Sequence, residues 1–404
     1  MKTTIQLFLA LLCLAFAGAK LQAVNPPPDG GYPNFATAEG DKALFNLSTG
    51  SGNTGVGWRS LSLDSTANFN TGIGAGALAL NNANSNTAVG AAALLLNGSG
   101  TENVAVGAEA LLFNNGGNFN NAVGGFALFN NSDGIGNNGF GDSALGANVS
   151  GSYNTAIGHN ALNNDAGNDM GIGDDNTAVG AFALLSNNSG SSNTALGNET
   201  LGNCTTGNSN VAIGDRAGGA VVSGSNIICV GAQVAGADVS DTTWIANVYG
   251  VTTQSGTTAP VVVSDTGQLG TVASSERFKK DIATMNKASE AILSLRPVTF
   301  HYKTDTKDTP QFGLIAEEVA KVNPTLVLPD KEGKPYSVRY EQVNAMLLNE
   351  FLKEHRKVEQ QRRDFEAALA QQQKQIDALT AALQKVSAQL ELNKSAPQTV
   401  LNSQ

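Results

Sequence analysis

The sequence has few charged side chains, and its positive charge is concentrated at one end. Charged residues make up 14% of the 404 residues, and only Lys42, Arg59 and Arg216 are basic between residues 40 and 250. The formal net charge is −10. Because binding to a phosphate backbone requires clustered basic side chains, this composition excludes nucleic acid as a partner. The chain also changes character near residue 270, where the basic residues begin.

Long apolar runs are missing except at the start of the chain. Lys2, an apolar run at residues 5–16 and the small residues 17–19 form the pattern of a secretory signal peptide, with cleavage after Ala19 or Ala23. The run is too short to span a bilayer, and no later segment could do so. We therefore expect a protein that is secreted or held at the cell surface, without a transmembrane anchor in the mature chain.

Cysteine is scarce. After loss of Cys13 with the signal peptide, only Cys204 and Cys229 remain, and they occupy different positions in the repeat described next. An exported protein can keep a disulfide, but this placement favours two buried thiols. No cluster of His and Cys indicates zinc, and we expect no cofactor.

A short pattern recurs through the region that lacks charge. The pattern Asn-x-x-[Val/Ile/Leu/Phe]-Gly-x-x-Ala-Leu repeats in steps of 17 residues, with one step of 16 and one of 22. Its glycines lie at 57, 74, 90, 107, 124, 141, 158, 180, 197 and 214, and Gly40 and Gly231 extend the series. A fixed period of this length indicates stacked units and argues against a disordered Asn/Gly-rich tract.

Each unit offers two apolar anchors. One is the residue before the glycine, such as Val106, and the other is the leucine four residues after it, such as Leu111. Two side chains cannot bury a core alone, so neighbouring units must stack. The asparagine four residues before the glycine, such as Asn103, would then form a ladder along the stack. The pattern predicts a parallel β-solenoid over residues 40–231, with one unit per rung.

Two units carry a longer motif, NTAIG at residues 154–158 and NVAIG at residues 210–214. With it, the region resembles the head repeats of trimeric autotransporter adhesins, whose motif is Asn-x-Val-Ala-Ile-Gly. The resemblance implies a parallel β-roll built from three copies of the chain. It leaves a cell-surface or glycan ligand open as a partner.

The 22-residue unit contains a group of acidic residues: Asp165, Asp169, Asp174 and Asp175. Carboxylates at this spacing could hold calcium, but we interpret the group as a solvated loop insertion. The GIGNNG stretch at residues 134–139 fits the repeat register and lacks the strand and helix that a dinucleotide site needs. The other rungs carry few acids, which gives little support to a glycan-cleaving site.

A connector over residues 232–273 follows the repeats. β-Branched runs flank Ser264-Asp265-Thr266-Gly267, which predicts a hairpin with Gly267 in its turn. Trp244 and Tyr249 are expected to cap the end of the solenoid.

The stretch VASSERFKKDI at residues 272–282 introduces serine beside basic residues. A serine becomes nucleophilic when a base takes its proton, and a lysine can be that base when its amine is neutral. Ser274 and Lys279 are five residues apart, with Arg277 between them. Taken alone, the segment favours a helix start capped by Ser274 or Ser275.

Three further blocks follow this stretch in order, LSLRPVTFHYK, QFGLIAEEVAKVNPTLV and YEQVNAMLLNEFLKE. Together the four blocks resemble the intramolecular chaperone auto-processing domain, the self-cleaving module of phage endosialidase tailspikes, over residues 274–365. In the third block the spacing of Phe312, Leu314, Ile315 and Val319 predicts a helix that turns these side chains into the core.

This second resemblance implies one cut in cis between Ala273 and Ser274. Ser274 would be the nucleophile, Lys279 the general base, and Arg277 a positioning or oxyanion-binding group. Ser275 with Lys280 is the alternative pair. The reaction needs no metal or cofactor.

Apolar residues continue at alternating steps of three and four from Leu348 to Leu390. This spacing predicts a coiled coil over residues 348–392, with His355, Arg362 and Gln372 as polar positions in the seam. A disordered tail is expected at 393–404.

The sequence therefore predicts a mainly β protein. A signal peptide (1–23) and a linker (24–39) precede the solenoid, which is followed by the connector, a small α+β chaperone domain and the coiled coil. We expect a secreted homotrimeric fibre whose C-terminal domain assists assembly and then cuts itself off. The alternative is an uncleaved surface adhesin, in which that domain serves only for trimerisation.

Overall fold

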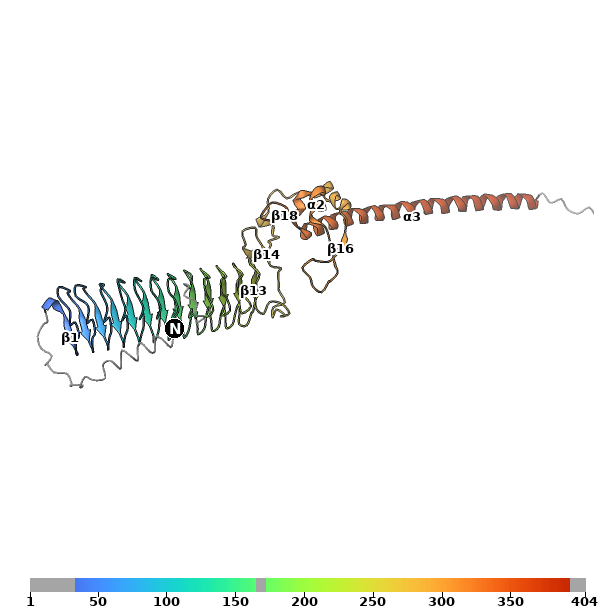
Figure 1. Cartoon of the computed structure of the whole chain (residues 1–404). Helices are drawn as coiled ribbons and strands as arrows, with labels where there is room; N and C mark the ends of the chain where they lie inside the picture. Colours follow the sequence, from blue (N-terminus) through green and yellow to red (C-terminus); the bar gives the residue numbers. More distant parts are fainter. Residues whose placement is uncertain (1–32, 165–171, 393–404) are drawn as a thin grey trace, which may run out of the picture. The chain divides into compact units, whose positions relative to one another are not determined.

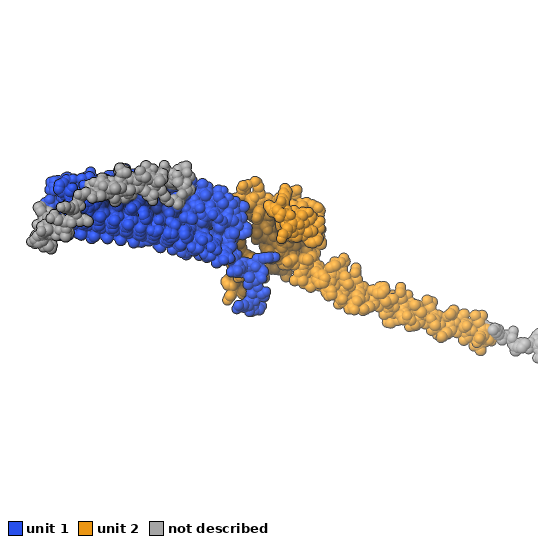
Figure 2. Space-filling view, turned by 60° about the horizontal axis from the view of Figure 1, so that its bottom comes forward, with its two compact units in different colours: residues 1–256 blue, residues 257–404 orange. Residues whose placement is uncertain are grey.

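The computed structural model describes residues 33–164 and 172–392, and the chain forms two compact units that divide at residue 256 (Figures 1 and 2). The predicted signal peptide, with its cleavage sites after Ala19 and Ala23, and the predicted tail lie outside the described residues. So do Asp165 and Asp169 of the acidic group.

The first unit is the predicted parallel β-solenoid. After a short 3₁₀ turn η1 (Pro33–Phe35), one three-residue strand per unit pairs in parallel with the next strand along the chain, giving a single sheet of 13 strands. The strands are β1 (Thr37–Glu39), β2 (Thr54–Val56), β3 (Thr71–Ile73), β4 (Thr87–Val89), β5 (Val104–Val106), β6 (Asn121–Val123), β7 (Asn138–Phe140), β8 (Thr155–Ile157), β9 (Thr177–Val179), β10 (Thr194–Leu196), β11 (Val211–Ile213), β12 (Ile228–Val230) and β13 (Thr243–Ile245).

The core contains one of the two predicted anchors. The leucine after the glycine is buried in the units from Leu44 to Leu201, as Leu111 shows, and it packs with the middle residues of the strands, such as Ala105. The expectation for the residue before the glycine was wrong, because Val106 and its equivalents point outward. Alternate strand residues face opposite sides, so burial of the middle alanine places both flanking residues on the outer face.

The repeated glycine is required by close backbone contact between rungs. At Gly107, φ is 141°, and a Cβ atom would lie 2.3 Å from the carbonyl oxygen of Gly124 on the next rung. A side chain cannot fit there. The following leucine takes up a left-handed conformation, with φ of 53° at Leu111, and its burial offsets the cost of this conformation.

The asparagine ladder is confirmed, and a second ladder runs beside it. In the first ladder, the Asn120 backbone N–H donates to Oδ1 of Asn103 at 3.0 Å, and the Asn137 N–H donates to Asn120 at 2.9 Å. In the second ladder, side-chain amides donate from one rung to the next, as from Asn114 Nδ2 to Asn97 Oδ1 at 2.7 Å. Both ladders are buried, so the polar interior is paired rung by rung.

Both remaining cysteines are buried free thiols, as predicted. Cys204 occupies a position of the second ladder, 3.8 Å from Asn210 Nδ2, whereas Cys229 takes the place of the middle alanine in β12. Burial raises the pKa of both thiols.

The last rungs are closed by an aspartate that the sequence did not single out. The Asp238 carboxylate accepts backbone N–H groups from Val222, Ser223 and Gly224, at 2.9, 2.9 and 2.6 Å. Trp244 pairs with Cys229 at the end of the sheet, but Tyr249 is fully exposed, so its predicted capping role was wrong.

The second unit begins with the predicted hairpin and continues as a small α+β domain. The hairpin strands β14 (Val262–Val263) and β15 (Leu269–Gly270) pair in antiparallel fashion, with φ of 85° at Gly267 in the turn. The elements that follow are η2 (Glu276–Phe278), η3 (Asn286–Ser294), β16 (Val298–Phe300), β17 (Gln311–Gly313), α2 (Ala316–Val322), η4 (Pro324–Leu326), β18 (Val327–Pro329), β19 (Pro335–Val338) and α3 (Tyr340–Leu392).

The core of this domain is small. Its buried residues come from α2, η4, β18, β19 and the start of α3: Val319, Leu326, Val327, Val338 and Met346. The predicted packing of the third block was partly wrong, because Phe312 lies in β17 and is 82% exposed. Beyond its first turns α3 has no buried side chain, and the residues of the predicted coiled-coil seam, from Leu348 to Leu390, are exposed.

Candidate cleavage site and chaperone domain

The residues predicted to cut the chain lie on an exposed segment between β15 and η3. Ser275 takes the N-cap position of the one-turn η2 helix, although its side chain makes no capping hydrogen bond. Lys279 ends the turn, where its backbone N–H donates to the Glu276 carbonyl oxygen at 2.9 Å. A 3₁₀ residue advances the chain by about 2.0 Å, against about 3.3 Å when extended. The turn therefore shortens the path between Ser274 and Lys279.

The predicted side chains lie on one short segment, but no hydrogen bond connects Ser274 with Lys279. Ala273, Ser274, Arg277 and Lys279 are all exposed, and no hydrogen bond between Ser274 and Lys279 is described. The Arg277 guanidinium lies over the Phe278 ring, 4.6 Å from its centroid. In the single chain, no hydrogen bond therefore joins the two groups of the predicted dyad.

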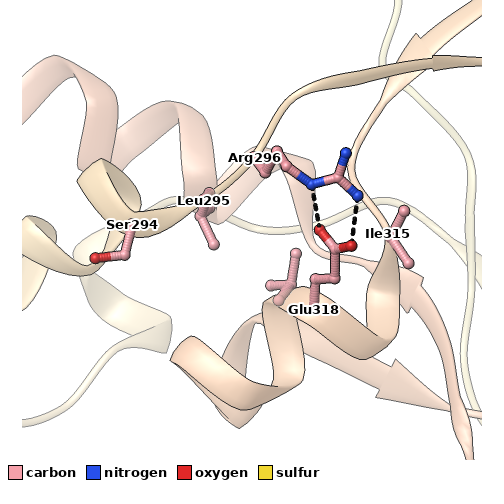
Figure 3. A pocket seen from close by; sticks show the side chains of 6 residues that line it. Ser294, Leu295, Arg296, Ile315 and Glu318 are labelled. Carbon is pink, nitrogen blue, oxygen red and sulfur yellow. Dashed lines mark hydrogen bonds and ion pairs between the residues drawn. The ribbon is translucent and has the colours of Figure 1, made fainter.

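A small cavity lies beside α2, between residues 294–296 and 315–319 (Figure 3). Arg296 makes a bidentate ion pair with Glu318, with Nη2–Oε1 at 2.5 Å and Nε–Oε2 at 3.1 Å. The pair lowers the pKa of the Glu318 carboxyl and raises that of Arg296. The cavity has a volume of about 30 Å³, room for about one water molecule. The Arg296–Glu318 ion pair fixes α2 against the residues after η3, and the cavity is too small to take a substrate.

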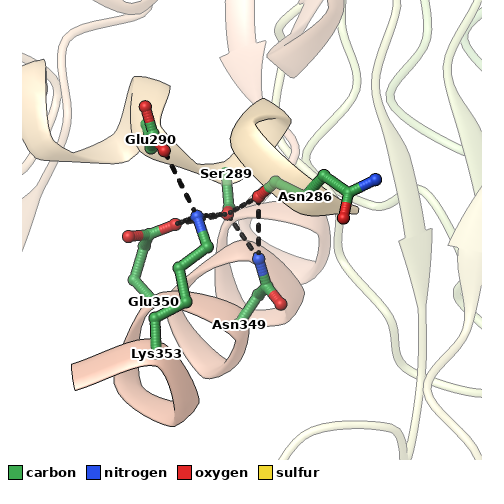
Figure 4. Close-up of polar contacts among 6 residues, drawn as sticks. All are labelled: Asn286, Ser289, Glu290, Asn349, Glu350 and Lys353. Carbon is green, nitrogen blue, oxygen red and sulfur yellow. Dashed lines mark hydrogen bonds and ion pairs between the residues drawn. The ribbon is translucent and has the colours of Figure 1, made fainter. Parts of the chain in front are cut away.

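A polar cluster around the buried Ser289, here called the clamp, fastens η3 to α3 (Figure 4). The fully buried Ser289 hydroxyl donates to the Glu350 carboxylate and accepts from Asn349 Nδ2 at 2.6 Å. Lys353 Nζ lies 2.7 Å from Glu350 and 3.5 Å from Glu290. The clamp could not be predicted from the sequence, because its only signal is that Asn349, Glu350 and Lys353 lie within one turn of a helix.

The clamp contains a serine–lysine contact, yet its electrostatics argue against catalysis. Lys353 Nζ is 3.4 Å from Ser289 Oγ. However, the Glu350 hydrogen bond and charge raise the pKa of Lys353, which keeps its amine protonated. A protonated lysine cannot take the serine proton, so we assign the clamp a structural role.

Neither a metal centre nor a membrane span is found in the described part of the chain. Among residues 33–164 and 172–392, no three His, Cys, Asp or Glu side chains are grouped so that they could hold a metal. Asp174, one of the four acids considered for calcium, accepts the Ser152 backbone N–H at 2.8 Å instead. No helix in the same ranges combines the length and apolar character needed to cross a bilayer.

Comparison with known families identifies the domain that begins at the candidate cleavage site. Residues 274–328 match the Peptidase_S74 model, described as the chaperone of endosialidase. No curated protein and no solved structure matches the chain. The matched segment starts at Ser274, four residues after the end of β15 in the hairpin, and ends within β18. The chain therefore carries an endosialidase-type chaperone domain after a repetitive β-solenoid, which supports an intramolecular chaperone role in a fibre-like protein.

Proposed function

We propose that the chain is the precursor of a secreted homotrimeric fibre, whose C-terminal domain aligns three copies and then releases itself by a single cut between Ala273 and Ser274. Pairing long β-structures between chains is slow, because distant contacts must form before their cost is repaid. A domain that brings three chains together removes this barrier. Its later loss prevents the assembly from running backwards and leaves a kinetically stable fibre.

The proposed chemistry uses side chains of the exposed segment. The neutral Lys279 amine takes the Ser274 hydroxyl proton, and Ser274 Oγ attacks the Ala273 carbonyl carbon. The Ala273–Ser274 C–N bond breaks as the proton passes to the Ser274 nitrogen, leaving an ester between Ala273 and Ser274 Oγ. Water then hydrolyses the ester to the Ala273 carboxylate and the free Ser274 hydroxyl. Arg277 is assigned to the developing oxyanion.

One observation carries this proposal. The chaperone match begins at residue 274, which is the residue that would become the new N-terminus after the cut. The η2 turn, which shortens the path from Ser274 to Lys279, adds support.

Exposure of the site in the single chain suggests when the cut occurs. A lysine acts as a base only when burial or a neighbouring cation keeps its amine neutral. Lys279 is exposed in the single chain. We infer that a neighbouring copy covers the segment in the trimer, so that cleavage follows assembly.

The test is a denaturing gel of the expressed chain, with N-terminal sequencing of the smaller fragment. We expect two bands, a new N-terminus at Ser274, and a single band for Ser274→Ala and for Lys279→Met. Ser275→Ala and Lys280→Met serve as matched controls and should still cut. A fragment that starts at Ser275 would transfer the reaction to the Ser275–Lys280 pair. A chain that remains intact would favour the uncleaved adhesin.

A further inference from the structure

One bend of the solenoid rung carries exposed aromatic side chains. The residue two positions before each strand has a left-handed backbone in every rung, with φ between 56° and 69°, and we call this series the bend row. Aromatic residues occupy the bend row before β1, β3, β6 and β8. Its members are Phe35, Gly52, Phe69, Ser85, Glu102, Phe119, Gly136, Tyr153, Asp175, Ser192, Ser209, Asn226 and Asp241.

The aromatic members of the bend row are strained and exposed at the same time. A left-handed backbone is unfavourable for a bulky residue, whereas glycine, asparagine and aspartate, which other rungs place here, adopt it at lower cost. At Leu111 burial offsets this cost. Phe69, Phe119 and Tyr153 are instead 68%, 54% and 63% exposed. Backbone strain that packing does not offset is a mark of functional sites.

Hydrogen bonds between rungs hold the rings in a fixed register. The Phe119 backbone N–H donates to the Thr101 carbonyl oxygen, one rung earlier, at 3.1 Å. The Tyr153 N–H donates in the same way to the Ile135 carbonyl oxygen at 2.8 Å. Rungs stand about 4.8 Å apart, so Phe119 and Tyr153, which are two rungs apart, are separated by about 10 Å along the solenoid.

Glycine makes room for two of the rings. A Cβ atom on Gly136 would lie 2.9 Å from Cδ1 of Tyr153, and one on Gly52 would lie 2.8 Å from Cδ1 of Phe69. Both rings therefore lie over a glycine of the preceding rung. Because Gly136 has no side chain, nothing projects from the bend row between Phe119 and Tyr153.

The spacing of the rings fits a chain of sugars. An extended chain of β-linked pyranoses advances by about the height of one rung per sugar, so rings two rungs apart meet alternate sugars. The face of an aromatic ring carries partial negative charge and packs against the C–H groups on the apolar face of a pyranose. Phe119 and Tyr153 form one such pair, and Phe35 and Phe69, also two rungs apart, form a second.

Uncharged polar groups beside the rings suit sugar hydroxyls. From β1 to β8 the residue before each member of the bend row is Asn, Ser or Thr, except at Ile135, and Glu102 is the only charged member. A few placed polar groups beside an apolar surface are the usual composition of a binding site. The net charge of −10 opposes an acidic polymer.

A peptide strand fits this surface less well than a sugar chain does. Strand addition needs free backbone N–H and C=O groups. Along the bend row these groups are already paired between rungs, as in the bond from the Gly136 N–H to the Asn118 carbonyl oxygen at 3.0 Å. Side chains are therefore what this surface offers to a ligand.

We propose that the bend row from β1 to β8 binds a neutral polysaccharide chain, which lies along the solenoid with alternate sugars stacked on the aromatic rings. The site belongs to the part of the chain before Ala273. It therefore stays with the fibre after the proposed cut, and it does not depend on that cut.

Affinity electrophoresis of the full-length chain tests the site, in gels that contain hydroxyethylcellulose, xylan or galactomannan. We expect at least one of these neutral polymers to retard the wild type, and Phe119→Asn combined with Tyr153→Asn to weaken this binding at least tenfold. Asparagine occupies the bend row naturally at Asn226 and adopts its backbone conformation at lower cost. The double variant should therefore be at least as stable in urea as the wild type, which a structural role of the rings would not allow.

Phe126→Asn is the matched control. Phe126 lies elsewhere in the same rung as Phe119, is 44% exposed and also has a left-handed backbone, with φ of 56°. Its substitution should leave the retardation unchanged. Equal loss of binding in this control would overturn the proposal, and so would a double variant less stable than the wild type.

Two further outcomes would overturn the polysaccharide site. One is the failure of all three polymers to retard the wild type. The other is retardation by gelatin in their place, which would mean a peptide occupant. A denaturing gel of the same samples reports the cut at Ala273 separately, so failure of the binding site and failure of the proposed function are distinguished.

Discussion

The backbone N–H of Asn120 donates to the side-chain oxygen of Asn103, one rung earlier, at 3.0 Å. The Asn120 side chain repeats this arrangement toward Asn137 and also donates to the Gly134 carbonyl oxygen at 2.8 Å. Each ladder asparagine thus satisfies backbone groups on its own rung and on a neighbouring rung. A buried polar group without a partner is costly, so the ladder holds the stack in register as well as filling it.

We predict that Asn120→Ala destabilises the solenoid by about 1–3 kcal/mol, because the buried Asn137 N–H loses its acceptor and the Gly134 carbonyl keeps only its hydrogen bond from Asn131. Urea unfolding followed by circular dichroism measures the change. Asn115→Ala, an exposed asparagine on the same unit, is the matched control and should alter stability by less than about 0.5 kcal/mol. Equal effects of the two variants would contradict the structural importance of the ladder.

Asp238 should make the end of the solenoid sensitive to acid. Backbone hydrogen bonds from Val222, Gly224 and Ser223 hold the pKa of this carboxyl well below its usual value of 3.8. Because the folded pKa is below the unfolded one, the stabilisation is complete above the unfolded value and is lost as pH falls through the folded value.

We therefore predict that Asp238→Asn lowers the unfolding free energy at pH 7, and that its difference from the wild type shrinks as pH is lowered below about 4. Urea unfolding at a series of pH values measures this difference. Asp41→Asn, at the opposite end of the solenoid, controls for the loss of one negative charge. A difference that stays constant down to pH 2 would show that the carboxylate charge does not stabilise this end.

The clamp should govern how firmly α3 is attached to the chaperone domain. Ser289→Ala removes the donor to Glu350 and the acceptor for Asn349 in a buried site, so we predict a loss of about 1–3 kcal/mol. Faster hydrogen exchange at the amides of the first turns of α3 would report the loosening. Ser294→Ala, an exposed serine of the same η3 helix, should leave exchange unchanged. If both variants exchange alike, Ser289 does not fasten the helix.

Much of the fold could be predicted because the repeat puts the same chemistry at the same place in every rung. The 17-residue period predicted the stack, the leucine core and the ladder that includes Asn103. It could not decide whether Ala105 or Val106 faces inward, since both are apolar and adjacent. The larger side chain was the wrong choice, because the inner position packs against the buried leucine and takes a small residue, such as Ala105, Gly139 or Cys229.

The candidate site was less predictable because its contacts are not local. The motif indicated Ser274 and Lys279 by residue type and spacing, but one exposed segment does not bring them together. Ser289 and Glu350, which do form a hydrogen bond, are 61 residues apart, and no residue near Ser289 in the sequence indicates this partner. Phe312 shows a related difficulty. Its spacing from Leu314, Ile315 and Val319 predicted a helix, but Phe312 lies in the strand β17.

The seam of α3 provides the test that links assembly to cleavage. Ile376 is 54% exposed on a helix that makes no contact there, so Ile376→Asp removes nothing from the single chain. In a trimer, each copy would lose about 1.5–3 kcal/mol of apolar burial and would add a charge to the seam. We predict that the native mass falls from three chains to one and that the fraction of cleaved chain falls with it. Light scattering and a denaturing gel measure the two quantities. Ala381→Asp, on the opposite face of α3, should change neither. If the variant had the mass of one chain and were still cleaved normally, cleavage would not depend on assembly. Lys279 would then have to be activated within one copy of the chain.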